Sequence, residues 1–558
     1  MYTAPVAEQR FVLDAVTGIG DLGVDSDTVD AILEGAGAFA AGEFAPLNRV
    51  GDTQGARWAD GQVTMPPGYR DAYRAYVEGG WGSLDGPEHA GGQGLPFALA
   101  MIVLEDLGAA NMAFTLCPML TVGAIEAIHT HGTDDQRVVY LPKLVSGEWT
   151  GTMNLTEPQA GSDVGALRST ATPAADGSWK IIGTKIYITF GEHDLADNIV
   201  HLVLARTPDA PAGTKGISLF LVPKLRSGAD GAFTVPNDVR CVSIEHKLVI
   251  NASPTCVMSY GDNGDCHGWL IGPEMGGMRA MFTMMNNARL NVGLQGVQIG
   301  ERALQAATAY ARDRVQGGRA IIEYPDVRRM LMRMQALTQG ARALLYAAAG
   351  DVDRAKAGLK GAKARLDVLT PLAKAWGTDV GCEVASLGVQ IHGGMGFVEE
   401  TGAAQHYRDI RIAPIYEGTN GIQAADLVGR KLTGDGGTAI RALIAASRAE
   451  GAASPTLVAL CDRASAVTDW MLSASPDDRL AGSYPYLDML AVAAAGGFMM
   501  RQATIAAAML EKGEGDPAFL TNKISVARFF ADQIAAEALG KEISATAGNA
   551  ALDAAAAL

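Results

Sequence analysis

Residues 386–432 read SLGVQIHGGMGFVEETGAAQHYRDIRIAPIYEGTNGIQAADLVGRKL, and the rest of the chain can be interpreted around this stretch. The pattern predicts one helix, a break at the paired glycines, a short polar turn and the start of another helix. Glu417 lies in the turn, after an apolar approach and before Gly418. A carboxylate beside apolar residues loses water, which raises its basicity and suits a general base. From these residues alone, the alternative is a solvated loop glutamate followed by an ordinary turn.

Two earlier stretches offer polar groups to a ligand. LTEPQAGSD, at 155–163, predicts a loop with hydroxyls and free backbone N–H groups, which suit an anionic or amide-edged ligand. A turn that leads into a strand is the alternative. In KIYITFGE, at 185–192, Tyr187 and Thr189 alternate onto one face of a predicted strand and could wall a planar ring. An ordinary strand of a sheet is the alternative there.

IYEGTNGIQ, preceded by QIHGGMGF, resembles the signature of the acyl-CoA dehydrogenase family of flavoproteins. The stretches at 155–163 and 185–192 resemble that family's flavin-contacting motifs, in the same order, so the resemblance extends from roughly residue 35 to residue 432. It implies an FAD-dependent enzyme that converts an acyl-CoA thioester to the trans-2-enoyl-CoA. It also implies that electrons pass to an electron-transfer flavoprotein.

The resemblance assigns roles to individual residues. Glu417 is expected to abstract the C2 proton while C3 gives hydride to flavin N5, with the thioester oxygen polarised by the Glu417 N–H and a ribityl hydroxyl. The residues implied to bind FAD are Thr156, Gly161, Ser162, Tyr187, Ile188, Thr189, Arg314, Gln390, Gly393, Gly394 and Thr419. Those implied to bind the substrate are Ser162, Asn286, Arg289 and Gly418.

Four of these residues imply an oligomer. Arg314 matches an arginine that the family places on the FAD pyrophosphate of a neighbouring subunit, and a guanidinium fork suits phosphate. A solvated arginine at a helix end is the alternative. Gln390, Gly393 and Gly394 match the stretch that closes on the adenosine side of the same cofactor. A homodimer or higher homo-oligomer is therefore expected. Tyr324-Pro325 replaces a His-Gln pair of the family, so this part of the flavin site is expected to differ.

The periods of the apolar residues change in blocks along the chain, which predicts an α+β fold. Helical spacing over 1–150 gives way to short β-branched runs over 151–275, which predict a small antiparallel barrel. Helical spacing returns over 276–432, and Ala-rich helices fill 439–558 after a linker at 433–438. The succession resembles the family's architecture: an N-terminal helical domain, a middle antiparallel β-barrel and a four-helix-bundle-like domain. The last block resembles the extra C-terminal helical domain of its larger members.

Composition excludes several classes of protein. The net charge of -16 argues against nucleic acid or an anionic membrane as the main partner. The six cysteines are scattered without ligand spacing, so no metal site is predicted and reduced thiols in a cytoplasmic protein are expected. The apolar run Met489–Met500 is about half a bilayer span, so a buried helix is favoured over an integral membrane segment. The N-terminus has no apolar run typical of a secretory signal.

GIGDLG, at 18–23, fits the dinucleotide-binding pattern G-x-G-x-x-G. That site needs a strand before the pattern and a helix that opens inside it. Here Val24 to Asp27 predict a turn and a helix N-cap, so we interpret the match as fortuitous.

Two other functions fit parts of the sequence. An acyl-CoA oxidase of the same fold would use O2 directly. A flavin-bearing nucleic-acid-associated protein is the other alternative. The DNA-repair-associated branch of the family has a strongly basic C-terminal tail, whereas the C-terminal tail of this chain is acidic, which weighs against that function. The larger family members act on acyl chains of several lengths and on sulfur-bearing acyl-CoAs such as methylmercaptopropionyl-CoA. The sequence does not select among these substrates, because pocket volume decides them.

Overall fold

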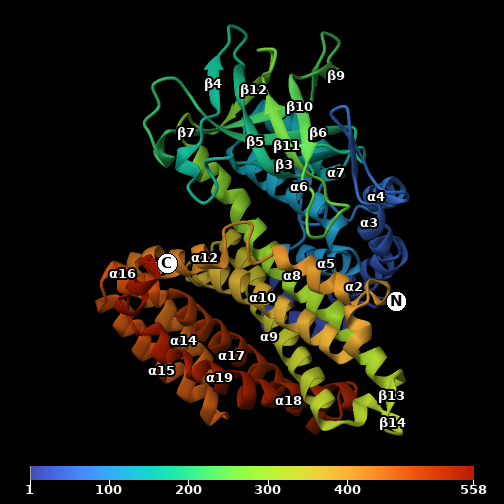
Figure 1. Cartoon of the computed structure of the whole chain (residues 1–558), viewed down its shortest axis with the longest axis vertical. Coiled ribbons are helices and arrows are strands. Elements are labelled where there is room, and N and C mark those ends of the chain that lie inside the picture. Colours follow the sequence, from blue (N-terminus) through green and yellow to red (C-terminus); the bar gives the residue numbers. More distant parts are fainter. Residues whose placement is uncertain (1, 558) are drawn as a thin grey trace. The chain divides into compact units, whose positions relative to one another are not determined.

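The computed structural model describes residues 2–557 and divides into two compact units (Figure 1). The first unit comprises residues 38–95 and 110–288. The second comprises 2–37, 96–109 and the chain from 289 onward. Helices precede and follow a block of strands, so the α+β fold class predicted from the sequence is confirmed.

The helices of the first unit differ in burial: the helix at 112–131 is apolar almost all round and largely buried, whereas the others bury only part of their residues. Asn111 caps α6 (Met112–His131) by accepting the N–H of Phe114 at 3.1 Å. A capping box of Thr133 and Gln136 starts α7 (Asp134–Ser146). The unit also contains α3 (Asn48–Gln54), α4 (Tyr69–Glu78) and a hairpin of β1 (Arg57–Ala59) and β2 (Gln62–Thr64).

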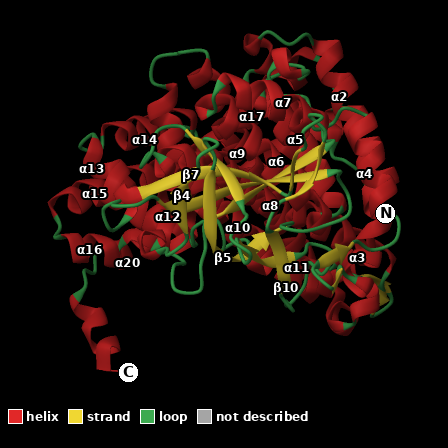
Figure 2. Ribbon diagram, turned by 90° about the horizontal axis from the view of Figure 1, so that it is seen from above, coloured by secondary structure: helices red, strands yellow, loops and turns green. Residues whose placement is uncertain are grey.

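An eight-stranded sheet forms the rest of the first unit, and its strands are among those coloured yellow in Figure 2. The strands are β3 (Trp149–Asn154), β4 (Thr170–Pro173), β5 (Trp179–Thr189), β6 (Asn198–Arg206), β7 (Ile217–Pro223), β10 (Val239–Ile244), β11 (Thr255–Tyr260) and β12 (His267–Ile271). Their order is β10-β11-β5-β12-β7-β6-β3, and β4 pairs with β5 and β6. Most neighbours are antiparallel, as predicted, but β3 and β4 each pair with β6 in parallel. A separate hairpin joins β8 (Leu225–Ser227) to β9 (Phe233–Pro236).

One face of the sheet encloses an apolar core. Ile181, Phe220 and Tyr260 are almost completely buried in it, and the Tyr260 hydroxyl donates to Asn154 Oδ1 at 2.8 Å. A turn at 175–177 joins β4 to β5, which pair from Pro173 opposite Trp179. The alternating apolar residues of these strands therefore place one side of each strand in the core.

Three long helices dominate the second unit. The helical spacing predicted from residue 276 onward begins with a single long helix, α8 (Gly277–Asp313), whose first residues belong to the first unit. Pro325 opens α9 (Pro325–Lys356), where its missing N–H costs no hydrogen bond. α10 (Ala362–His392) packs along α9 and ends at Gly393, whose φ of +60° is unfavourable for other residues. The helix break predicted at the paired glycines is thus confirmed.

The last residues of the chain form further helices that pack on these. α17 (Ser483–Lys512) contains the run Met489–Met500 and contacts α9, α10 and α12 (Asn420–Asp426). The linker is shorter than predicted, because α13 (Leu432–Gly434) continues the helix and α14 (Thr438–Glu450) starts at once. The other helices are α11 (Ala403–Asp409), α15 (Pro455–Ser473), α16 (Pro476–Ala481), α18 (Pro517–Phe529), α19 (Ala535–Leu539) and α20 (Lys541–Ala545).

The N-terminal part of the second unit contains α1 (Val6–Val12), α2 (Ser26–Phe39) and α5 (Phe97–Ala110). A π-helical turn, Leu13–Thr17, precedes Gly18 where a dinucleotide site would need a strand. Asp25 accepts the N–H of Thr28 at 2.9 Å and caps α2, as predicted. The interpretation of GIGDLG as a fortuitous match is confirmed.

Two helices, α6 and α17, are long and apolar enough to cross a membrane. However, 83% and 72% of their most apolar windows are buried within the protein, as in core helices of soluble proteins. Within residues 2–557, no group of three His, Cys, Asp or Glu side chains is placed to hold a metal ion. The six cysteines are free thiols.

Candidate functional site

Glu417 lies in a tight turn between a short helical turn, Ile410–Ile412, and α12. Its φ is +56°, a left-handed conformation that is costly for a residue with a side chain, and Gly418 follows at +84°. The turn is held in place because the Asn420 N–H donates to the Pro414 carbonyl at 3.0 Å. In addition, Gln423 Nε2 donates to the Gly418 carbonyl at 3.2 Å. The strained backbone therefore fixes where the Glu417 carboxylate points.

The Glu417 side chain is half-buried among charged neighbours. Burial raises its pKa to about 7, although Arg289 from α8 and Lys374 from α10 act in the opposite direction. Both cations are buried, and Arg289 is only 6% exposed. A carboxyl group whose pKa lies near neutral pH can accept a proton and release it again under physiological conditions. The desolvation inferred from the apolar approach agrees with this environment.

Lys374 is a neighbour of Glu417 that the sequence analysis missed. It is completely buried, and burial lowers its pKa to about 7 despite the opposing charges of Glu417 and Asp379. Its Nζ donates to Asn420 Oδ1 at 2.9 Å. One signal could have identified it: a single lysine inside the otherwise apolar helix run 371–377, PLAKAWG. A lysine is rarely fully buried unless it has a partner.

The other predicted residues of the second unit lie in exposed or half-buried positions. Thr419 caps α12 by accepting the Ile422 N–H at 3.2 Å. Gln390 is exposed in the last turn of α10, and Gly393 and Gly394 follow it. A Cβ added to either glycine would meet no atom within 4 Å, so a ligand could approach the backbone there.

Arg314 is exposed directly after α8, beside a small hairpin of β13 (Val315–Gln316) and β14 (Arg319–Ala320). The Tyr324 hydroxyl donates to the Gln316 carbonyl at 2.8 Å and fixes this hairpin. The Tyr-Pro pair that departs from the family pattern therefore has a local structural role next to Arg314.

In the first unit, Thr156, Gly161 and Ser162 lie on the loop after β3. The Thr156 carbonyl accepts the N–H of Ile186 at 2.9 Å, which ties the loop to β5. Gly161 and Ser162 are exposed, and a Cβ at Gly161 would meet nothing within 4 Å. Asn286 is exposed on α8.

Tyr187 does not follow the regular alternation that we predicted. The pairing of β5 with β11 shifts by one residue between Lys185 and Ile188, so a bulge contains Tyr187, whose φ is +60°. The Tyr187 ring is 60% exposed, whereas Thr189 is half-buried. Ile188 packs its side chain into the sheet core, so only its backbone is available to a cofactor. Strain at Tyr187 and at Glu417 coincides with two predicted site residues.

A buried ion pair positions the loop at 155–163, and the sequence analysis missed it. Lys185 Nζ lies 2.8 Å from Glu157 Oε1, and both side chains are almost fully buried. Burial would raise the pKa of Glu157, but Lys185 and hydrogen bonds lower it to about 2. The same carboxylate accepts the backbone N–H groups of Arg168 at 2.6 Å and Ser169 at 3.1 Å. Removing either charge would leave the other buried and unpaired.

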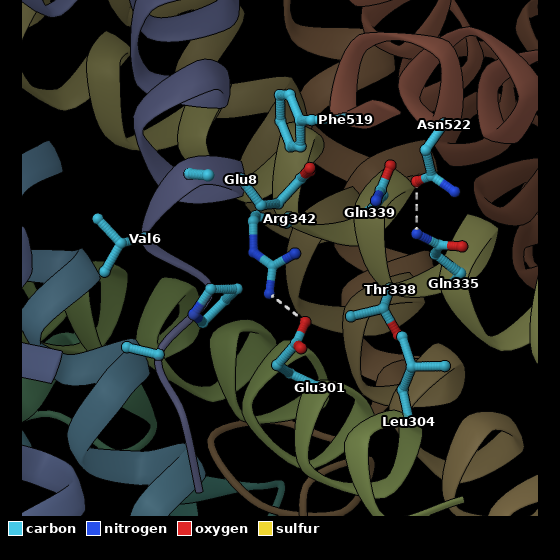
Figure 3. Close-up of a pocket in the computed structure, with 13 residues that line it drawn as sticks. Val6, Glu8, Glu301, Leu304, Gln335, Thr338, Gln339, Arg342, Phe519 and Asn522 are labelled. Carbon is cyan, nitrogen blue, oxygen red and sulfur yellow. Dashed lines mark hydrogen bonds and ion pairs between the residues drawn. The ribbon is translucent and has the colours of Figure 1, made fainter. Parts of the chain in front are cut away.

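A cavity of about 430 Å³ lies elsewhere in the second unit (Figure 3). It is lined by the N-terminal residues 4–8 and by side chains of α8, α9 and α18, including Glu301, Arg342 and Asn522. None of the residues predicted to bind FAD or substrate lines it.

The residues predicted to hold FAD suit such a group in each unit taken separately. The exposed Tyr187 ring offers a flat apolar surface. The glycines at 161, 393 and 394 leave open space where phosphate or ribose could contact backbone N–H groups. The exposed Arg314 adds a fork for phosphate.

Four matches to protein families span most of the chain. Residues 26–148, 152–260 and 275–432 match the N-terminal, middle and C-terminal domains of acyl-CoA dehydrogenase, in that order. Residues 438–555 match the family described as acetyl-CoA dehydrogenase C-terminal like. The chain belongs to the acyl-CoA dehydrogenase family. It is therefore an enzyme of the acyl-CoA dehydrogenase class, and the resemblance noted from its sequence is confirmed.

Relatives of the same length support this assignment. The chain is 48% identical, over 96% of both sequences, to 3-methylmercaptopropionyl-CoA dehydrogenase of Ruegeria pomeroyi. Two solved structures share the acyl-CoA dehydrogenase fold. ACDH-11 of Caenorhabditis elegans, in complex with C11-CoA, has a TM-score of 0.79 at 19% identity, with 99% of this chain and 96% of that chain covered. An acyl-CoA dehydrogenase of Bacillus anthracis, complexed with FAD, has a TM-score of 0.77 at 22% identity, with coverage of 94% and 88%.

Proposed function

We propose that this enzyme removes hydrogen from C2 and C3 of an acyl-CoA thioester and that Glu417 is the base. The observation that carries the proposal is a half-buried carboxyl group, on a strained turn of the family signature, whose pKa is raised to about 7. Such a group can take the C2 proton at neutral pH and keep it within the site.

The residues around Glu417 support this role. Arg289 and Lys374 stabilise the ionised carboxylate before it accepts the proton. The left-handed turn at Glu417 and Gly418 fixes the direction of the base, which supplies orientation. The Glu417 N–H would donate to the thioester oxygen and make the C2 proton more acidic. Ser162, Asn286, Arg289 and Gly418 would contact the substrate.

FAD is the cofactor in this proposal, and when bound it supplies the acceptor for the hydride that leaves C3. Thr156 and Thr189 would offer hydroxyls to its ring, and Tyr187 a flat surface. Arg314 would bind the pyrophosphate of a neighbouring subunit's cofactor, so the active protein is a homodimer or higher homo-oligomer. The residues completing the set are Gly161, Ser162, Ile188, Gln390, Gly393, Gly394 and Thr419.

We further propose a cytoplasmic enzyme that passes its electrons to an electron-transfer flavoprotein. Four domains are proposed, at 1–150, 151–275, 276–432 and 439–558, and the family matches support these bounds. The relative in Ruegeria pomeroyi makes 3-methylmercaptopropionyl-CoA the first substrate to test.

Anaerobic reduction of the purified flavoprotein by a panel of acyl-CoAs tests the proposal. Glu417→Gln should keep bound flavin but slow its reduction by about a hundred- to ten-thousand-fold, the usual contribution of a general base. Glu400→Gln is the matched control, because Glu400 is an exposed carboxylate in the same segment, and its rate should not change. Rapid reduction in Glu417→Gln would refute the assignment.

Comparing peroxide formation with dye reduction distinguishes a dehydrogenase from an oxidase.

A further inference from the structure

The C-terminal helices contribute a side chain to the polar network next to Glu417. The hydroxyl of Tyr484, in the first turn of α17, donates to Asp379 Oδ2 at 2.6 Å. Asp379 lies on α10, and its other oxygen accepts the Asn420 side-chain amide at 2.9 Å. Asn420 Oδ1 in turn accepts from Lys374 Nζ at 2.9 Å. One continuous chain of hydrogen bonds therefore connects Tyr484 with Lys374.

The chemistry of the groups sets the direction of each bond. An ionised carboxylate only accepts, so Asp379 draws the NH2 group of Asn420 toward itself. The carbonyl oxygen of Asn420 must then face Lys374, where it favours the protonated amine. The Asn420 NH2 group also donates to the Ala375 carbonyl at 3.1 Å, which reinforces the same orientation. Asn420 is only 3% exposed, so water does not compete for these bonds.

The hydrogen bond from Tyr484 favours the ionised form of Asp379. Burial raises the pKa of Asp379, whereas the hydrogen bonds from Tyr484 and Asn420 lower it. Without the Tyr484 hydroxyl, Asp379 would bind a proton more readily and could then donate as well as accept. The amide of Asn420 would lose the group that fixes its orientation, and Lys374 would lose a dependable acceptor.

We propose that Tyr484 is a positioning residue of the active site, which orients Asn420 through Asp379 and so holds the Lys374 ammonium group near Glu417. The inference rests on the proposed function of Glu417 as the base. We call the hydrogen-bonded chain from Tyr484 through Asp379 and Asn420 to Lys374 the relay. The C-terminal helices have a specific role in the reaction, because they supply Tyr484, the outer end of the relay, while Lys374, its inner end, is the cation that acts on the base.

Other charged groups contact the same region and remain unchanged in the test. Arg289 from α8 acts on Glu417, and Asp426 and Arg430 act on Arg289. The phenol of Tyr416, next to Glu417, donates to Gln295 Oε1 at 2.5 Å. At the outer end, Lys541 from α20 acts on Asp379. Their effects are common to the wild type and the variants, so a difference reports the relay alone.

The pH dependence of flavin reduction by saturating acyl-CoA tests the relay in the holoenzyme. Lys374→Met should raise the apparent pKa of the base by about one to two pH units, since an opposite charge is lost. Tyr484→Phe should raise it by about half a unit, the equivalent of one hydrogen bond. Tyr486→Phe is the matched control. Tyr486 is on the same helix, and the substitution removes a hydroxyl there as well. That hydroxyl forms a hydrogen bond with the Thr468 hydroxyl at 2.7 Å and none with Asp379.

Infrared difference spectra provide a readout that does not depend on activity. The carbonyl stretch of the protonated Glu417 carboxyl, identified by its loss in Glu417→Gln, should persist to higher pH in Tyr484→Phe than in the wild type or Tyr486→Phe. Coincident titrations in all three proteins would overturn the relay, as would an equal shift in both tyrosine variants. If Lys374→Met fails to fold, the tyrosine pair still decides the question. If Glu417→Gln reduces flavin rapidly, the proposed base is wrong, while an infrared shift in Tyr484→Phe would still support the relay.

Discussion

In two buried polar networks of the second unit, the pKa of the central cation is shifted in opposite directions. In one, Arg342 on α9 contacts Glu105 at 3.0 Å and Glu301 at 2.8 Å, and part of this network is drawn in Figure 3. Burial would lower the pKa of Arg342, but these carboxylates hold it well above its usual value. In the other, burial prevails and the pKa of Lys374 falls to about 7.

The difference arises from the partners. Arg342 forms hydrogen bonds directly with two carboxylates, so its charge is compensated where it lies. Lys374 forms its hydrogen bond with the neutral amide of Asn420, and the opposite charges of Glu417 and Asp379 act on it electrostatically. The first arrangement fixes its charges at any physiological pH and suits a structural role. The second leaves a lysine and Glu417 close to their titration points, as is common where protons are transferred.

The largest expected effect tests the structural network. Arg342→Met should lower the free energy of unfolding by about 3–5 kcal/mol, because it leaves Glu105 and Glu301 buried beside each other without a cation. Arg448→Met is the control, since both side chains of the Arg448–Asp462 pair are more than half exposed and the pair should contribute little to stability. Denaturant unfolding of the two variants measures both values. Similar losses in both would show that burial does not distinguish the two ion pairs.

The second-largest expected effect tests whether the orientation of the Glu417 carboxylate depends on the left-handed backbone conformation at Gly418. Gly418→Ala places a side chain at a φ of +84°, where its Cβ would lie 2.8 Å from Gln423 Nε2. We expect a loss of about 1–2 kcal/mol in stability and a lower kcat, because the carboxylate is displaced. Gly421→Ala is the control: its Cβ, in α12, would lie 3.7 Å from Thr419 Oγ1, and the change should be close to neutral or slightly stabilising. An unchanged kcat in Gly418→Ala would mean that the strained turn is dispensable.

The smallest effect concerns the pH dependence of stability. The pKa of Glu417 is raised from 4.5 to about 7 on folding, so the folded state retains its proton over a range in which the unfolded state releases it. This group's contribution therefore decreases as pH rises from about 4.5 to 7. Glu417→Gln removes the titration, so its stability relative to the wild type should increase across that window. A rise in pKa of about 2.5 pH units corresponds to at most about 3 kcal/mol, and solvent screening of the half-buried carboxyl group reduces this to on the order of 1 kcal/mol. Thermal or denaturant unfolding at several pH values measures the slope. Parallel curves for the two proteins would contradict the raised pKa.

Much of the fold was predictable because it depends on local periodicity. The long helix after Gly276, the strand block with its turn at 175–177 and the helix break at Gly393 all follow from spacing and glycine chemistry. The bulge at Tyr187 was not predictable, because it is set by pairing with β11, about 70 residues further along the chain. The linker at 433–438 was predicted too long, because its glycines do not prevent a helical turn at Leu432–Gly434.

The sequence by itself determined the order of helical and strand blocks, the family signature and the position of Glu417 within it. Only the tertiary structure brought Lys374, Asn420 and Tyr484 into contact with a common carboxylate or with each other. These residues come from three helices that are far apart in the chain, and each is unremarkable in its own segment. Periodicity reports which face of an element is buried, whereas the pKa of a buried group depends on which distant charges share that burial.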